Sequence, residues 1–200
     1  MRRFVYALLM LAVSSVCFAQ SDSEKSKIAE IRKMYNSEME WISTMLGDET
    51  IPDDYISAKV CHNLAAVGQA EGTVEYFFND DFDEELGKNV SYLDFVRKTV
   101  VYTIAERKSY EEFLYDDDGF PAFYYTSFTT YLKDGEHYVE KYVEIRAYYD
   151  KGKLFHTICK VGNDQSSLTE VPLDEDLKVY LDFGYDAFEK NKKALDGLVN

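Results

Sequence analysis

Residues 120–161, FPAFYYTSFTTYLKDGEHYVEKYVEIRAYYDKGKLFHTICKV, decide the fold of this chain. Three runs rich in Tyr, Phe, Val and Thr (120–132, 137–149 and 153–161) are separated by two short turns that end in Gly135 and Gly152. Such runs are typical of β-strands, and glycine supplies the left-handed residue that a hairpin needs. Direct hairpins join antiparallel strands, because parallel strands need long crossovers. The stretch therefore predicts an antiparallel β-meander.

The same pattern continues toward the N-terminus, where Asp117-Asp118-Gly119 forms a further turn. The runs that predict strands there are 55–61, 73–78, 92–104 and 110–115. The small residues of 63–72 and the acidic residues of 79–88 predict loops between them. We therefore expect a long, curved meander of about six or seven strands.

Two helices are expected at the ends of the mature chain. In residues 22–46, apolar side chains recur every three or four positions, with Ser21 and Glu24 placed for a capping box. A second helix is expected to begin at Pro172, with acids in its first turn. We predict an α+β fold in which an N-terminal and a C-terminal helix cover one face of the meander. No Pro- or Ser-rich linker divides residues 20–200, so they should form a single domain.

The first nineteen residues predict export. Arg2 and Arg3 precede an apolar run, and small residues lead to an expected cut after Ala19. An uncleaved anchor is the alternative, but the apolar run is shorter than a bilayer span. Lipidation at Cys17 is a second alternative, which Val16 at the preceding position disfavours. We expect residues 1–19 to be a signal peptide and the mature protein to be periplasmic or secreted.

Export leaves two cysteines, Cys61 and Cys159, in an oxidising compartment. They form either a disulfide or two separate thiols. Because the two residues lie in predicted strands that are far apart in strand order, and a bridge needs Cα atoms within about 7 Å, free thiols are favoured.

The charge of the chain limits its partners. The 200 residues include 37 acids and 22 Lys or Arg, a formal net charge of -15. Nucleic acids and anionic lipid surfaces are bound through Lys and Arg, so both are disfavoured. The expected partner is a protein or a small ligand, with no stable membrane insertion after cleavage.

The sequence lacks the motifs of common catalytic and cofactor sites. It contains no H-E-x-x-H, G-x-S-x-G, P-loop or dinucleotide-binding pattern. Asp116, Asp117 and Asp118 are consecutive, whereas a calcium loop alternates its ligands. His62, His137 and His156 are expected to be structural or surface residues. We predict no metal and no cofactor.

Strand 137–149 carries the candidate binding surface. Val143, Ile145 and Ala147 alternate with charged and aromatic residues, so one face meets the core and the other faces solvent or a partner. The candidate binding residues on that other face are Tyr142, Tyr148, Tyr125 and Phe123. The favoured function is a non-enzymatic binding module that uses the exposed sheet face. The alternatives are a periplasmic glycoside or ester hydrolase with a carboxylate pair, and a structural component of a cell-envelope assembly.

Three runs carry a resemblance: NLAAVGQAEGTVEYFF (63–78), YEEFLYDDDGFPAFYY (110–125) and EIRAYYDKGKL (144–154). Over residues 24–162 the chain resembles a loosely defined group of small exported proteins from Gram-negative bacteria, with one N-terminal helix and a Tyr-rich meander punctuated by D-x-G turns. The group has no assigned activity, so the resemblance implies a fold and a compartment and no site residues.

Overall fold

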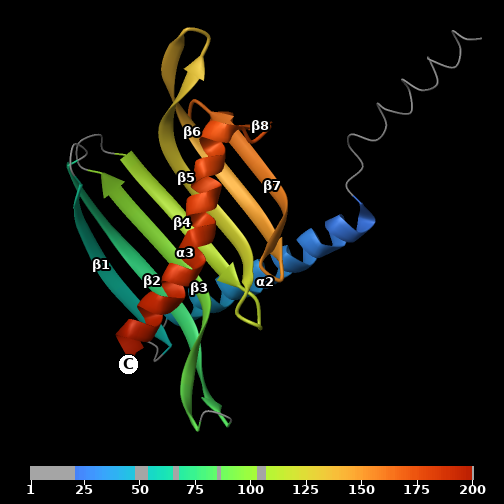
Figure 1. Cartoon of the computed structure of the whole chain (residues 1–200), viewed down its shortest axis with the longest axis vertical. Helices are drawn as coiled ribbons and strands as arrows, with labels where there is room; N and C mark the ends of the chain where they lie inside the picture. Colours follow the sequence, from blue (N-terminus) through green and yellow to red (C-terminus); the bar gives the residue numbers. More distant parts are fainter. Residues whose placement is uncertain (1–20, 48–53, 65–67, 85–86, 103–106, 200) are drawn as a thin grey trace, which may run out of the picture.

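The computed structural model describes residues 21–47, 54–64, 68–84, 87–102 and 107–199. In these ranges one antiparallel sheet is flanked by two α-helices, α2 (Asp22–Gly47) and α3 (Glu175–Val199) (Figure 1). The prediction of an α+β meander with an N-terminal and a C-terminal helix is confirmed. The predicted signal peptide and its cut after Ala19 lie outside the described residues.

The sheet is an open meander whose spatial order equals its chain order, β1 to β8. Every neighbouring pair is antiparallel, as the hairpin turns predicted. The strands are β1 (Tyr55–Leu64), β2 (Gly68–Asp83), β3 (Lys88–Tyr102), β4 (Arg107–Tyr115), β5 (Pro121–Asp134), β6 (His137–Asp150), β7 (Lys153–Gly162) and β8 (Thr169–Val171). A short 3₁₀ helix, η1 (Gln165–Ser167), precedes β8. The three turn glycines Gly119, Gly135 and Gly152 have φ values of 75°, 64° and 73°.

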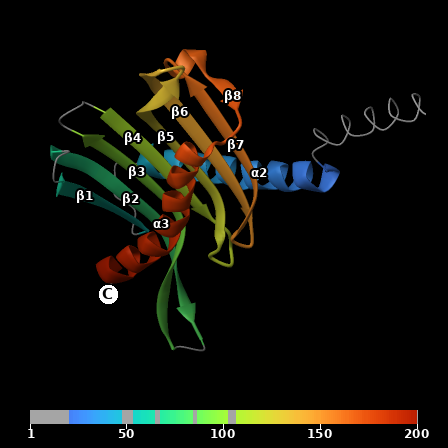
Figure 2. The ribbon, with the colours of Figure 1, turned by 45° about the horizontal axis from the view of Figure 1, so that its top comes forward.

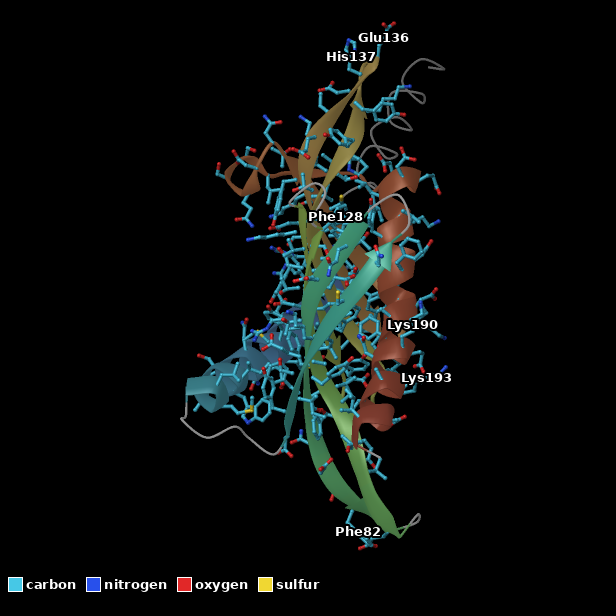
Figure 3. All side chains as sticks on the ribbon, turned by 90° about the vertical axis from the view of Figure 1, so that its left-hand side faces the viewer. Phe82, Phe128, Glu136, His137, Lys190 and Lys193 are labelled. Carbon is cyan, nitrogen blue, oxygen red and sulfur yellow. The ribbon has the colours of Figure 1, made fainter. Side chains whose placement is uncertain are left out.

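The two helices lie on opposite faces of the sheet, and the expectation that both cover one face is wrong in this respect. Viewed from its edge, the sheet runs between α2 and α3 (Figure 3). Ile28, Ile31 and Ile42 of α2 pack against one face. Leu181, Phe188 and Leu195 of α3 pack against the other. Each helix buries its own apolar stripe, so the sheet has two hydrophobic cores.

Adjacent large residues on the strands serve the two cores. Phe77, Leu114 and Tyr148 belong to the α2 side, whereas the residues that follow them, Phe78, Tyr115 and Tyr149, belong to the α3 side. A register shift lies at each of these three steps. A β-bulge adds a residue to one strand and increases the local twist. Because successive residues of a strand point to opposite faces, these consecutive large residues are buried on both faces at one level of the sheet.

The helix ends follow local capping chemistry. The Glu24 amide donates to Ser21 Oγ at 3.1 Å at the start of α2, one half of the predicted capping box. At the start of α3 the Leu177 amide donates to Asp174 Oδ1 at 2.9 Å, so Asp174 is the N-cap. Pro172 therefore precedes the helix, and its predicted place in the first turn is wrong.

Two predicted loops are largely strand. β1 and β2 take in all of the described part of 63–72, and β2 and β3 extend as a hairpin through the acidic stretch 79–88. This hairpin projects from one end of the sheet, and the β5–β6 hairpin projects from the other (Figures 1 and 2). Outside the body of the molecule the residues are solvated on both sides, so the hydrophobic alternation that marks strands is lost.

The cysteines are separate thiols. Cys61 is exposed on β1 and Cys159 is buried on β7, with β2 to β6 between them. Neither α2 nor α3, the helices of the described ranges, combines the length and the apolar character that a bilayer span requires.

Candidate functional site

A row of polar side chains crosses the α2 side of the sheet. Strand pairing places Glu75 opposite Arg97, Arg97 opposite Glu112, Glu112 opposite Tyr125, and Tyr125 opposite Arg146. Directly paired residues point to the same face of an antiparallel sheet. The row therefore runs from β2 to β6 on one face, next to the apolar residues that α2 covers.

The centre of this polar row is Glu112, a buried carboxylate with 6% of its surface exposed. The Tyr35 hydroxyl of α2 donates to its Oε2 at 2.7 Å, and the Tyr110 hydroxyl of β4 donates to its Oε1 at 2.5 Å. Burial raises the pKa of Tyr35 and Tyr110, and the neighbouring Glu112 raises both further. Both tyrosines therefore stay protonated at neutral pH, and each remains a hydrogen-bond donor to the carboxylate.

A half-open cavity of about 400 Å³ lies where α2 meets this row. We call it the α2 cavity. From the helix side it is lined by Ile31, Arg32 and Tyr35. From the sheet side it is lined by Glu112 of β4, Phe123 and Tyr125 of β5, and Arg146 and Tyr148 of β6. Its walls combine apolar and aromatic side chains with three charged ones, Arg32, Glu112 and Arg146. Small-molecule sites likewise join apolar walls to a few polar groups.

Each of the two arginines lies over a tyrosine ring of the cavity. The Arg32 guanidinium carbon is 5.9 Å from the Tyr148 ring centroid, and the Arg146 guanidinium carbon is 5.7 Å from that of Tyr125. Arg32 Nε also lies 3.4 Å from the Tyr148 hydroxyl. Cation–π contacts hold both guanidinium planes at the cavity.

The four sequence-predicted binding residues share one face of the sheet, and three of them line the cavity. Phe123, Tyr125 and Tyr148 are cavity residues, whereas Tyr142 lies farther along β6, where its hydroxyl accepts from Gln165 Nε2 at 2.8 Å. The expectation that this face is exposed is wrong for Phe123 and Tyr148, which are 7% and 2% exposed, because α2 packs over them.

Sequence reasoning missed Arg32, Tyr35 and Glu112. Tyr35 shares the spacing of the apolar residues in 22–46, which accounts for its buried ring and gives no role to its hydroxyl. Glu112 lies in the run EEFLY, where it precedes buried Phe113 on a strand. An acid on the inward face of a strand within an aromatic run is the signal that points to a buried carboxylate, since Glu is rarely buried without a partner.

A second pair of carboxyl groups lies outside the α2 cavity. Glu38 Oε1 of α2 is buried with no hydrogen-bond partner among the described residues, and burial raises the pKa of Glu38 to about 7. Burial also raises the pKa of Asp94 to about 6, and the negative charge of Asp94 contributes to the shift of Glu38. Neither residue lines the cavity.

The described residues hold no group of three or more His, Cys, Asp or Glu side chains placed to bind a metal ion. The acidic turn at 116–118 has a structural role instead. Asp116 Oδ1 accepts from the Asp118 and Phe120 amides at 3.1 and 2.7 Å, which closes the turn between β4 and β5.

The chain has no match among protein-family models, among curated proteins or among solved structures. The resemblance to small exported proteins therefore stays a prediction, and any function must be argued from the site itself.

Proposed function

We propose that the protein is a binding module that holds a small amphipathic ligand in the α2 cavity. The observation that carries this proposal is the buried Glu112, held by two tyrosine hydroxyls at a cavity whose other walls are apolar and aromatic side chains and two arginines. Ile31, Phe123 and Tyr148 would contact the apolar part of the ligand. The polar end would lie near Arg32 and Arg146.

The polar row has no evident advantage for stability alone. Replacing buried charged groups by well-packed apolar residues is often neutral or stabilising, because burying charges has a large desolvation cost. The neighbouring row on the same face is apolar under α2 at Phe77, Phe95 and Leu114. A polar row beside it, open to a cavity of ligand size, is what a recognition site requires.

The predicted signal peptide supports a periplasmic or secreted binding protein. The ligand would then be one that a cell meets or handles outside its cytoplasm. The hydrolase alternative has less support, because Glu112 is the one carboxylate among the cavity-lining residues that the structure describes. Glycoside hydrolysis uses two carboxyl groups that flank the scissile bond.

Fluorescence titration with the neutral dye N-phenyl-1-naphthylamine tests the proposal. Tyr125→Ser removes a ring from the cavity and should weaken dye binding at least about tenfold, the effect of losing roughly 1.4 kcal/mol of contact. Tyr142→Ser is the matched control, since it removes the same side chain from the same face outside the cavity. Equal binding by the wild type and Tyr125→Ser, or loss of binding in Tyr142→Ser alone, would contradict the proposed site.

A further inference from the structure

We infer that the ligand of the α2 cavity carries an oxyanion, a carboxylate or a phosphate, which is bound by Arg32 and Arg146 from opposite sides. This inference rests on the proposed function and adds the chemical class of the ligand. It follows from which hydrogen-bonding groups of the cavity are already occupied and which are free.

The carboxylate of the cavity is already hydrogen-bonded within the protein. Each oxygen of Glu112 accepts a tyrosine hydroxyl, so the donors Tyr35 and Tyr110 are also used. Both oxygens of Glu112 therefore have a partner within the protein, and the carboxylate needs no donor from a ligand. The ring of Tyr35 packs edge-on against Phe95 and Phe123, 6.2 and 5.4 Å between centroids, which fixes the hydroxyl on the carboxylate.

The donors of the two arginines are mostly free. A guanidinium carries five N–H groups. Arg146 directs Nη2 to Glu144 Oε2 at 3.2 Å, and Arg32 has one long contact from Nε to the Tyr148 hydroxyl. Arg97 shows the contrast, because it forms a two-point pair with Glu75 at 2.6 and 3.0 Å. Within the described ranges Arg32 forms no ion pair, although the chain has 37 acids.

Contact with the tyrosine rings holds these free groups at the cavity. A guanidinium presents its N–H groups in its own plane, which suits a planar carboxylate or a phosphate. Tyr125 and Tyr148 both line the cavity, so the two planes border the same space. The net charge of -15 disfavours the binding of an anion elsewhere on the molecule. Binding of the ligand's oxyanion therefore depends on these two cations.

Two dyes of the same shape test the inference. 8-Anilino-1-naphthalenesulfonate is the sulfonated form of N-phenyl-1-naphthylamine, so the pair differs by one oxyanion. We expect Arg32→Gln and Arg146→Gln each to lower the affinity for the sulfonated dye about tenfold, the usual effect of losing a charge-assisted hydrogen bond. The neutral dye lacks the oxyanion, so it should lose less affinity than the sulfonate in each variant. Arg146→Lys retains the charge without the planar fork and should lie between the wild type and Arg146→Gln.

Lys33→Gln is the matched control, because Lys33 is exposed on α2 beside Arg32 and does not line the cavity. It changes the net charge equally and should leave both dyes unaffected. If the neutral dye depends on Tyr125 but the arginine variants bind both dyes as the wild type does, the oxyanion inference is overturned while the binding site stands. If neither dye depends on Tyr125, the proposed function fails with it.

Competition distinguishes the source of the oxyanion. Octanoate and octyl phosphate are added to the sulfonate-loaded protein, with octanol as the neutral control. Displacement by one of the acids at lower concentration identifies a carboxylate or a phosphate ligand. Displacement by octanol as strong as that by both acids would overturn the inference.

Discussion

Gly184 should be essential for the contact between α3 and the sheet, and Gly184→Ala is the variant that tests it. Gly184 lies in α3 at the point where the helix crosses Tyr124 of β5. A Cβ atom at this position would lie 2.3 Å from both Cε1 and Cζ of the Tyr124 ring, whereas ordinary contacts begin at 3.4 Å. The ring or the helix would have to move by about 1 Å, the difference between these distances.

Two effects of opposite sign determine the result. Alanine favours a helix over glycine by about 1 kcal/mol. Overpacking of a core costs about 1–3 kcal/mol, and occasionally more. The Tyr124 ring is 1% exposed and its hydroxyl donates to Glu111 at 2.9 Å, so it has no free direction in which to turn. If α3 moves instead, Phe188 loses contact with Phe113 in the same core. Because the ring is confined, the overpacking cost should lie at the upper end of its range, about 2–3 kcal/mol. Subtracting about 1 kcal/mol for helix propensity leaves an expected net loss of about 1–2 kcal/mol in the free energy of unfolding.

Urea denaturation followed by circular dichroism measures this loss. Gly197→Ala is the matched control on the same helix, because a Cβ there has no atom within 4 Å. The control should be neutral or stabilise by a few tenths of a kcal/mol, as expected near a helix end. A Gly184→Ala protein as stable as the wild type would refute the reasoning, since it would mean that helix and sheet are not in this close contact.

Three further predictions concern buried groups. Burial raises the pKa of Glu38 to about 7, so the folded state binds the proton more tightly than the unfolded state, and the wild type should lose stability as the pH rises from 4.5 to about 7. The loss should be about 1–2 kcal/mol after allowance for partial exposure, and Glu38→Gln should abolish it. Denaturation at pH 5 and 8 measures it, and an equal pH dependence in the variant contradicts it. At pH 8 iodoacetamide should alkylate exposed Cys61 and spare Cys159, whose pKa burial raises to about 11; equal labelling by peptide mass spectrometry would refute this. Phe188→Ala should cost about 3–5 kcal/mol in urea denaturation, because the side chain is fully buried, and a loss below about 1 kcal/mol would indicate that α3 is not packed on the sheet.

The meander could be predicted from the sequence because its signals are local. β5, β6 and β7 begin and end within two residues of the predicted runs, since the positive-φ glycines fix the turns. β8 was not predicted, because three residues that pair only with β7 leave no periodic pattern.

The placement of the helices could not be predicted in the same way. An apolar stripe shows that a helix packs on something, and not on which face of a sheet. The strand sequences themselves indicate that both faces of the sheet are covered. The runs 113–115 and 123–125 contain consecutive large apolar or aromatic residues, and strands that are covered on both faces lose strict alternation. Read in this way, the aromatic runs predict that both faces are covered.

The candidate site could be predicted only in part, because it depends on which face of the sheet α2 crosses. Alternation along β5 and β6 correctly placed Phe123, Tyr125 and Tyr148 on one face. It could not bring Tyr35 to Glu112, because the two residues are 77 positions apart and meet only when α2 crosses that face.

The attachment of α2 connects the fold to the proposed function. The N-terminal part of the helix is tied to the sheet by the Lys27–Asp150 ion pair and by Glu24, which lies 3.0 Å from His156 Nδ1. Its C-terminal part is held by apolar packing that includes Ile42. Between these two attachments the helix passes over the polar row, where Tyr35 is its polar contact with Glu112. The cavity is therefore set by how the two ends hold the helix, and a ligand that enters it can bind the free arginine N–H groups without displacing the hydrogen bond between Tyr35 and Glu112.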